Sequence, residues 1–425
     1  MNFENSQEYA QKLDQQDPLK SFRDRFIIPQ KNGKELIYFL GNSLGLQPKA
    51  TKHHIDSILN DWGKFGVEGF FSGKQPWYYL HDELTGTLSK IVGALPHEIV
   101  VMNQLTVNLH LMMVSFYNPA GKRKKIITEA KAFPSDQYML ESFLKFQGLD
   151  PDEIIIEISP SNGNYTIIID DILKAIDLYK DEVALLFFGA VNYYTGQLFN
   201  IPAIVQSAHA VGAKAGFDLA HAAGNTKVLL HEWDVDFACW CSYKYLNSGP
   251  GAIGGAFIHE RFHNDTSLQR LAGWWGYDKE SRFKMEKGFI PIKSAEGWQL
   301  STSSMVLFAM HKAALDIFED AGIENLVAKG RQLGNFLLYL LEQNNTANPK
   351  KRIQIITPRN EEERGCQISL LVQEGGREIF DALTNQGVFS DWREPNVIRI
   401  APVPLYNTYE EVWKFCEILR KMTGI

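Results

Sequence analysis

Asp218 and Lys244 carry a carboxylate and an amine, and their spacing in the sequence could bring the two groups into one site. Asp218 ends an apolar strand candidate at 214–217, and Lys244 follows another at 235–240. In an open parallel sheet, ligands bind beyond the carboxyl ends of the strands, so we expect both side chains at one edge. Pyridoxal phosphate requires a lysine amine for a Schiff base and a carboxylate that keeps its ring nitrogen protonated. The pair therefore predicts a pyridoxal-phosphate site.

The alternative interpretation of Asp218 and Lys244 is purely structural, and the residues around Lys244 help to judge it. A lone aspartate and a lone lysine are most often a turn cap and a surface cation. Lys244, however, stands between Tyr243 and Tyr245 in an aromatic stretch that we expect to be buried, and buried lysines are rare. On these residues alone, both interpretations stay open.

A phosphate group is expected at a helix N-terminus, where free N–H groups bind anions. Thr106 follows the strand candidate 99–102 and precedes the apolar helix candidate 107–117, so we expect Thr106 to be the N-cap. An N-cap without a ligand is the alternative. The glycine-rich run 249–255 matches no phosphate-loop fingerprint, and we expect a turn into the next strand there.

Other side chains also have two interpretations. Phe133 could stack on the cofactor ring while Ser135 and Asp136 add hydrogen bonds, or the segment could only open a helix with Ser135 as its cap. His221 could lie over the site or satisfy a buried turn. Arg399, a single arginine in an apolar strand, could clamp a substrate carboxylate or form a structural ion pair.

The elements that must position these residues alternate along the chain. Such alternation predicts an α/β fold with a mostly parallel, mixed sheet that is flanked by helices. The expected strands are apolar throughout, as in a sheet covered on both faces; they are 99–102, 125–128, 154–158, 183–189, 214–217, 235–240 and 254–258. The expected helices between them are 107–117, 135–146, 170–180 and 202–211.

The pattern changes near residues 300 to 310. Two long helical stretches, 304–319 and 323–343, precede shorter strands and helices that predict a smaller α+β C-terminal domain. We therefore expect three parts, which are an N-terminal segment, 1–48, packing on the small domain, a large cofactor-binding domain, 49–305, and the small domain, 306–425.

Composition restricts the classes of partner. The 425 residues carry a formal net charge of −7, which gives no support for nucleic-acid binding. The four cysteines form no disulfide framework and have no metal-ligand spacing, so we expect reduced thiols, no metal and a cytoplasmic protein. The N-terminus has no apolar signal region, and the longest apolar run is about half of what a membrane span needs.

Several segments together resemble the kynureninase family. They are YFLGNSLGLQP (38–48), MNQLTVNLHL (102–111), EAKAFPSD (129–136), YYTGQLFNIPAI (193–204), GFDLAHAAGN (216–225), DFACWCSYKYLNSGPG (236–251), GWWG (273–276), RFKM (282–285) and IRIAPVPLYN (398–407). The resemblance implies a fold-type I pyridoxal-phosphate enzyme, similar to class V aminotransferases, that works as a homodimer with shared active sites. It implies a hydrolase of carbon–carbon bonds that converts L-kynurenine to anthranilate and L-alanine, and 3-hydroxykynurenine to 3-hydroxyanthranilate, in tryptophan degradation and NAD biosynthesis.

The resemblance also assigns roles to individual residues. Lys244 would be the Schiff-base lysine, Asp218 the partner of the ring nitrogen, and Tyr243 an acid. The other cofactor-binding positions would be Leu105, Thr106, Phe133, Pro134, Ser135, Asp136, His221, Tyr243, Trp274 and Thr302, with Trp274 reaching the phosphate from the partner subunit. The substrate-binding positions would be Ser43, Phe70, Ser301, Thr302 and Arg399, with Arg399 taking the α-carboxylate.

Three positions depart from the family's pattern. Gly189 stands where a serine or threonine contacts the cofactor, so that hydrogen bond is expected to be absent or replaced. Phe70 and Thr302 stand where the animal members carry histidine and asparagine, so we expect weaker selection for the 3-hydroxyl group and kynurenine as the better substrate. A related fold-type I enzyme, such as a cysteine desulfurase or an aminotransferase, is the alternative. Cys366 and Cys416 fall in a strand and a helix candidate, which does not suit a desulfurase nucleophile on a mobile loop.

Overall fold

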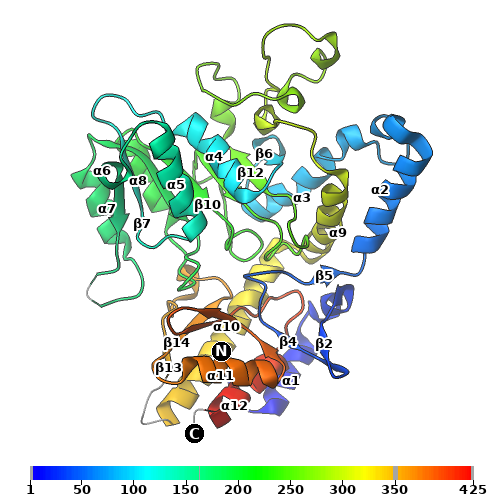
Figure 1. Ribbon diagram of the computed structural model, residues 1–425. Helices are drawn as coiled ribbons and strands as arrows, with labels where there is room; N and C mark the ends of the chain where they lie inside the picture. The colour runs from blue at the N-terminus through cyan, green and yellow to red at the C-terminus, as the bar shows by residue number, and fades with distance from the viewer. Residues whose placement is uncertain (1–2, 162, 348–352, 423–425) are drawn as a thin grey trace.

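The computed structural model describes residues 3–161, 163–347 and 353–422. It has a large body built on a seven-stranded sheet and a smaller body built on a four-stranded sheet, which lies below it in Figure 1. None of the helices in these ranges is long and apolar enough to cross a membrane.

The large sheet is mixed and mostly parallel. Its strand order is β6 (Ile99–Val101), β12 (Gly255–Ile258), β11 (Phe237–Trp240), β10 (Lys214–Asp218), β9 (Val183–Gly189), β7 (Lys125–Glu129) and β8 (Ile155–Ile158). Strand β12 is antiparallel to both of its neighbours, and the pairs from β11 to β8 are parallel. All seven strands lie where the sequence predicts them, and the glycine-rich run is a loop into β12, as expected.

Helices cover both faces of this sheet, which explains why its strands are apolar throughout. On one face, side chains such as Phe187 and Phe237 pack with α4 (Leu105–Phe116) and α5 (Pro134–Phe146). On the other face, Phe188 and Phe217 belong to a core with α3 (Asp82–Val92), α7 (Ile169–Leu178), α8 (Ile201–Ala210) and α9 (Met305–Ala321). Helix α2 (Thr51–Phe65) lies outside α9 and packs against it. The short helix α6 (Pro151–Ile154) leads into β8.

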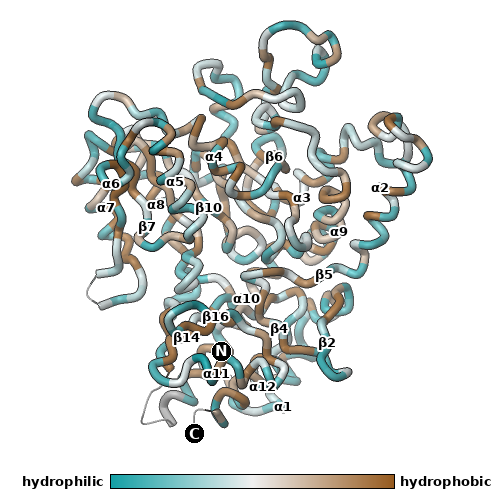
Figure 2. The backbone as a smooth tube through the Cα atoms, viewed as in Figure 1, coloured by the Kyte–Doolittle hydropathy of each residue, from teal (hydrophilic) through white to brown (hydrophobic). Residues whose placement is uncertain are grey.

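The smaller body is an antiparallel sheet with helices packed on it. Its strand order is β13 (Ile353–Ile355), β14 (Ile368–Val372), β17 (Val397–Ile400) and β16 (Asp391–Arg393), and its helices are α10 (Ile323–Ala347), α11 (Gly376–Asn385) and α12 (Tyr409–Met422). Strand β14 is mostly hydrophobic in Figure 2, and its Ile368 and Leu370 are fully buried. Because this sheet packs against helices, the smaller body has a hydrophobic core of its own.

The N-terminal segment packs on the smaller body. Helix α1 (Gln7–Gln16) contacts α12, and β4 (Ile37–Tyr38) pairs in parallel with β15 (Val388–Phe389). Further along, residues 41–45 form a turn that leaves the smaller body and meets the large one, since the N–H of Gly45 donates to the carbonyl of Tyr243 at 2.8 Å. The N-terminal segment therefore touches both bodies next to Lys244.

Candidate active site

Lys244 lies in the loop that follows β11, and its side chain is buried, with only 8% of the residue exposed. Its Nζ lies 3.1 Å from Nε2 of His221 and 5.6 Å from the ring centre of Phe133. Burial, and then the charge of Lys244, lower the pKa of His221 well below its ordinary value, so this imidazole is neutral. The amine is thus held between a neutral histidine and an aromatic ring, which confirms that Lys244 is not a surface cation.

Two buried carboxyl groups lie beside this lysine. Asp218 ends β10, and its Oδ1 accepts the N–H of Ala220 at 2.7 Å. Burial, and then the charge of Asp218 and a hydrogen bond to it, raise the pKa of Asp136 well above its ordinary value. Burial also raises the pKa of Asp218, while the charge of Lys244 lowers it. Asp136 therefore holds a proton more readily than Asp218, whose carboxylate faces the charge of Lys244.

The N-termini of α4 and α5 converge on this site. Thr106 and Ser135 are each the second residue of their helix, and their hydroxyl groups are 2.7 Å apart. The expectation that Thr106 is the N-cap of α4 is wrong, because Gln104 occupies that position; Phe133, and not Ser135, is the N-cap of α5. Both hydroxyls instead lie among the first free N–H groups of two helices, where they can join those groups around one anion.

The sequence did not reveal the role of Glu129, which ends β7 and is buried. Its Oε1 accepts the N–H of Gly189 at 3.0 Å, and its Oε2 accepts from Nδ2 of Asn192 at 2.6 Å. Burial raises the pKa of Glu129 to about 7. A β-carbon on residue 189 would lie 2.8 Å from this carboxylate, so the glycine leaves room for it. One signal was available in the sequence, since Glu129 closes an apolar strand in the same way as Asp218.

Arg399 on β17 is almost fully buried and is paired within the chain. Its Nη2 forms an ion pair with Asp391, and its Nη1 donates to the carbonyl of Tyr193 at 2.6 Å. The ring of Tyr193 lies edge-on to Phe133, with 5.3 Å between the ring centres. The structural ion pair that was the alternative for Arg399 is thus present in the fold. Through Tyr193, Arg399 is also connected to Phe133, which lies beside Lys244.

The residue types around Lys244 fit pyridoxal phosphate. Asp136 Oδ1 and His221 Nδ1 are buried without a hydrogen-bond partner in the described residues, and both belong to the group that surrounds the lysine amine. A buried polar atom without a partner costs free energy, so such atoms mark a place where a polar ligand binds. An amine, a negative carboxylate, an aromatic ring and two helix N-termini supply what the cofactor's aldehyde, ring nitrogen, ring face and phosphate each require.

Phe70 and Trp274 lie in a different part of the structure from Lys244. They belong to an aromatic cluster made by residues 70–78 and 274–283, in which the rings of Phe70 and Trp275 are 6.1 Å apart. Ser301 and Thr302 are exposed and follow Leu300, whose carbonyl accepts the N–H of Trp275. Within one chain, these expected site residues are therefore grouped with each other and apart from the lysine.

Comparisons with known proteins place these features in a family. A protein from Flavobacterium psychrophilum described as a kynureninase is 52% identical over 421 residues, which cover 99% of both chains. Another, from Koribacter versatilis, is 48% identical, with 98% of this chain and 97% of the relative covered. The sequence model of the kynureninase C-terminal domain matches residues 326–419. The chain belongs to the kynureninase family.

Solved structures show the same fold. A cysteine desulfurase from Thermococcus onnurineus superposes with a TM-score of 0.75 at 18% identity, covering 91% of this chain and 94% of that one. A mutant of C-DES, with glycine covalently linked to its PLP cofactor, also gives 0.75, at 16% identity and with 90% and 96% covered. The predicted fold-type I architecture is confirmed, and so are the family and its cofactor, pyridoxal 5'-phosphate. Like other kynureninases, the chain is a pyridoxal-phosphate-dependent hydrolase.

Proposed function

We propose that this chain hydrolyses L-kynurenine to anthranilate and L-alanine, and 3-hydroxykynurenine to 3-hydroxyanthranilate and L-alanine. The observation that carries the proposal is full-length identity of 52% to a kynureninase, together with a buried amine at Lys244 beside Asp218. Structural likeness to a cysteine desulfurase and to the cystine C–S lyase C-DES is at 18% identity or less, and it bears on the fold alone.

The proposal assigns a place to each group of the cofactor. Lys244 would hold the aldehyde carbon, Asp218 would face the ring nitrogen, and Phe133 would stack on the ring. Leu105, Thr106 and the segment Phe133–Asp136 would bind the phosphate and the ring edge through helix N-termini and hydroxyl groups. When bound, pyridoxal phosphate supplies an electron sink that stabilises negative charge on the substrate's carbon atoms.

The chain's own residues would then move protons. The Nζ of Lys244, once released, would take the α-proton of the substrate, and neutral His221 at 3.1 Å can accept a hydrogen bond from the resulting ammonium. Burial raises the pKa of the Tyr243 phenol, so the phenol keeps its proton at neutral pH. Tyr243 is therefore our candidate for the acid that protonates the β-carbon as the carbon–carbon bond breaks and water adds to the adjacent carbonyl.

Arg399 would bind the α-carboxylate of the substrate. The Nε atom of its guanidinium is buried without a hydrogen-bond partner in the described residues. The charges of Arg399 and Arg393 both lower the pKa of His221, so both arginines lie near this histidine. Asp391 and the Tyr193 carbonyl hold the guanidinium in a fixed orientation, which favours recognition of a planar carboxylate. Ser43, Phe70, Ser301 and Thr302 would bind the rest of the substrate, and Thr302 would also contact the cofactor.

The proposal includes a cytoplasmic homodimer with shared active sites. Trp274 is 48% exposed and lies in the aromatic cluster apart from Lys244, as expected of a residue that reaches the phosphate of the partner subunit. Phe71, Phe283 and Met285 are each more than half exposed near it, which is typical of a surface that another chain covers. The four cysteines are free and buried, in agreement with a reducing compartment.

We also propose the division into 1–48, 49–305 and 306–425. The contacts of α1 and β4 with α12 and β15 support the first part as an extension of the small domain. Helix α9, which begins at the proposed boundary, packs against α2 and α3 and so connects the two larger parts.

Turnover assays test the proposal directly. Purified enzyme with added pyridoxal phosphate should release anthranilate and alanine in equal amounts from kynurenine, and no sulfur from cysteine. Lys244→Ala should abolish both products, because the amine is removed. Release of alanine from cysteine in preference to kynurenine would contradict the proposal and favour a desulfurase.

A further inference from the structure

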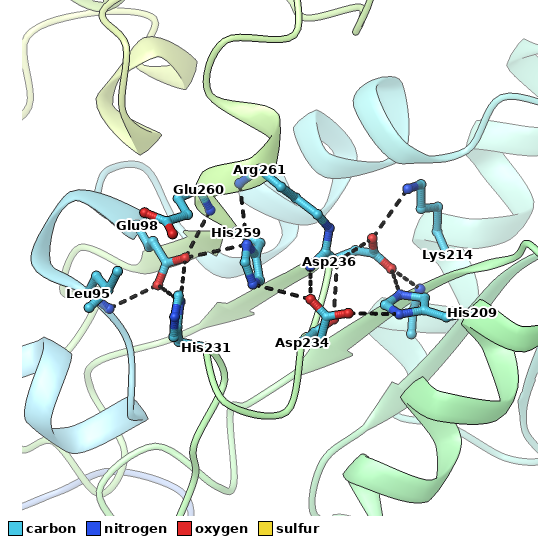
Figure 3. Close-up of polar contacts among 11 residues, drawn as sticks. Leu95, Glu98, His209, Lys214, His231, Asp234, Asp236, His259, Glu260 and Arg261 are labelled. Atoms are coloured by element: carbon cyan, nitrogen blue, oxygen red, sulfur yellow. Dashed lines mark hydrogen bonds and ion pairs between the residues drawn. The ribbon is translucent and has the colours of Figure 1, made fainter.

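A second group of ionisable side chains, some of them buried, lies at the other end of the large sheet. Figure 3 shows His231 and His259 both directed at the carboxylate of Glu98, with Asp234 and Arg261 next to His259. Glu98 is fully buried, and it precedes β6; His259 follows β12, and His231 lies in the connection between β10 and β11. Three segments that are far apart in the sequence therefore present metal-binding atoms to one point.

The distances between these atoms suit one small ion. His231 Nδ1 lies 3.0 Å from Oε1 of Glu98, and His259 Nδ1 lies 3.6 Å from the same oxygen. The three ligand atoms all lie within 4.8 Å of one another. A tetrahedral zinc ion with bonds of about 2.0–2.1 Å holds its nitrogen and oxygen ligands about 3.3 Å apart. The side chain of His231 is 37% exposed, so it has room to turn its Nδ1 toward an ion.

We propose that Glu98, His231 and His259 form a zinc-type metal site, with solvent as the fourth ligand on the exposed side of His231. Two imidazole nitrogens and one carboxylate are the ligands that zinc and related transition-metal ions select, whereas magnesium and calcium prefer oxygen alone. Binding would replace the hydrogen bond between His231 Nδ1 and Glu98, with Nδ1 as the unprotonated nitrogen of the ring.

The surroundings of the three ligands resemble those of built metal sites. His259 Nε2 lies 3.3 Å from Asp234, and a metal-binding histidine usually donates its second N–H to a carboxylate in this way. Arg261 in turn forms an ion pair with Asp234. The N–H groups of Leu95 and Glu260 each donate to the carboxylate of Glu98 at 2.9 Å and fix its orientation.

The Nδ1 atom of His259 acts as an acceptor in the structure, since the backbone N–H of Arg261 donates to it at 3.3 Å. A metal ion would take this lone pair and replace the hydrogen bond, because a metal-binding imidazole nitrogen must be unprotonated.

The site would fasten the sheet at the end away from the lysine. Strand β11 separates residues 231–236 from the loop that carries Lys244, so an ion there is expected to leave turnover nearly unchanged. It would tie the connection before β11 to the ends of β6 and β12, and binding to the native state alone would raise the melting temperature.

Zinc binding by the holoenzyme tests the proposal. After removal of metal with a chelator, Zn²⁺ is titrated against a chromophoric competitor, and the bound metal is measured by elemental analysis. We expect about one ion per chain, with His231→Ala and His259→Ala each weakening binding by at least about 100-fold and Asp234→Asn by about 10-fold. The side chain of His231 is partly exposed, so His231→Ala should fold normally. Its kynurenine turnover should match that of the parent enzyme, and this measurement checks the fold.

His97→Ala is the matched control, since His97 is an exposed histidine that pairs with Glu260 outside the three ligands; its zinc affinity should stay within about twofold of the parent's. A second set of possible ligands in the described residues, His81, Asp82 and Glu296, serves as the internal alternative. Absence of zinc binding, or zinc that His231→Ala retains and His81→Ala loses, would overturn the proposal.

Discussion

At the scale of single residues, the amine of Lys244 is the group on which the proposed reaction depends. Lys244→Ala should remove the visible absorbance of covalently held cofactor and lower kcat by at least about 10³-fold, because acid–base catalysis by one positioned group contributes about 10²–10⁴-fold. Borohydride reduction followed by peptide mapping should label residue 244 in the parent enzyme. A label on another lysine would contradict the assignment. Lys329 is the suitable comparison, since it is also buried but is paired with Asp17 at 2.7 Å.

Glu129 should make stability depend on pH. Its pKa is about 7 in the folded chain and 4.5 ordinarily, because burial disfavours its charge. Between these pH values the native state holds a proton that the unfolded chain has released, so the free energy of unfolding falls as pH rises, by up to roughly 3 kcal/mol. Glu129→Gln removes this dependence.

Urea unfolding of the two apoenzymes at pH 4.5 and pH 8 measures this effect. The parent should lose roughly 3 kcal/mol relative to Glu129→Gln over that range, since other titrating groups cancel in the comparison. A constant difference between the two proteins would show that Glu129 does not titrate there.

Phe70 and Thr302 are the residues with which we test substrate preference. The double variant Phe70→His, Thr302→Asn adds polar partners for a 3-hydroxyl group, and a hydrogen bond contributes about 0.5–1.5 kcal/mol, or roughly 2- to 12-fold. The ratio of kcat/KM for 3-hydroxykynurenine over kynurenine should rise by that factor. An unchanged ratio, with turnover retained, would show that these positions do not face the substrate's aromatic ring.

At the scale of elements, the turn at residues 41–45 joins the N-terminal segment to the catalytic loop. A β-carbon at Gly45 would collide with the backbone carbonyl of Lys244 and with the side chain of Asn247. Gly45→Ala should therefore displace the turn, cost about 1–3 kcal/mol and weaken cofactor binding. Thermal unfolding and cofactor titration measure the two effects. Gly63→Ala is the control, because Gly63 lies in α2 with open space around it, and alanine there should be neutral or stabilising.

The order of strands and helices could be predicted from the sequence because apolar runs and helical spacing are local signals. The seven strands of the large sheet and helices α4, α5, α7 and α8 are found within a few residues of their predicted ranges. The two-residue strands β4 and β15 are different, because they form only through pairing with each other across 350 residues of chain (388 minus 37 is 351). No local pattern in the sequence reveals this pairing.

The candidate site was predicted in part for the same reason. Asp218 and Lys244 could be paired from strand order alone, because β10 and β11 are adjacent and parallel. The contact of Glu129 with Gly189 and Asn192 depends on β9 lying beside β7, which no local pattern shows. The proposed metal ligands are also invisible in the sequence, since positions 98, 231 and 259 have no ligand spacing and meet only through the fold.

At the scale of the whole molecule, the aromatic cluster and the lysine site are separate in one chain. Trp274, Trp275 and Phe283 are held by each other and by Arg282, whose guanidinium lies 4.5 Å from the ring centre of Trp275. In a twofold-symmetric dimer, the same surface patch of each subunit forms the interface. A residue that lies far from the active site of its own chain can therefore complete the active site of its partner. That arrangement would make Trp274 part of an active site only in the assembled dimer.

Mixing two damaged subunits distinguishes this arrangement from a site built within one chain. Lys244→Ala should be inactive, and Trp274→Ala should bind cofactor weakly. If Trp274 acts on the partner, a mixed dimer has one site with both defects and one intact site, so an equal mixture after subunit exchange should have about one quarter of all sites intact. If Trp274 acts within its own chain, each mixed dimer has two damaged sites, and activity stays at half of the Trp274→Ala level. Full cofactor affinity of Trp274→Ala on its own would contradict the phosphate contact in either arrangement.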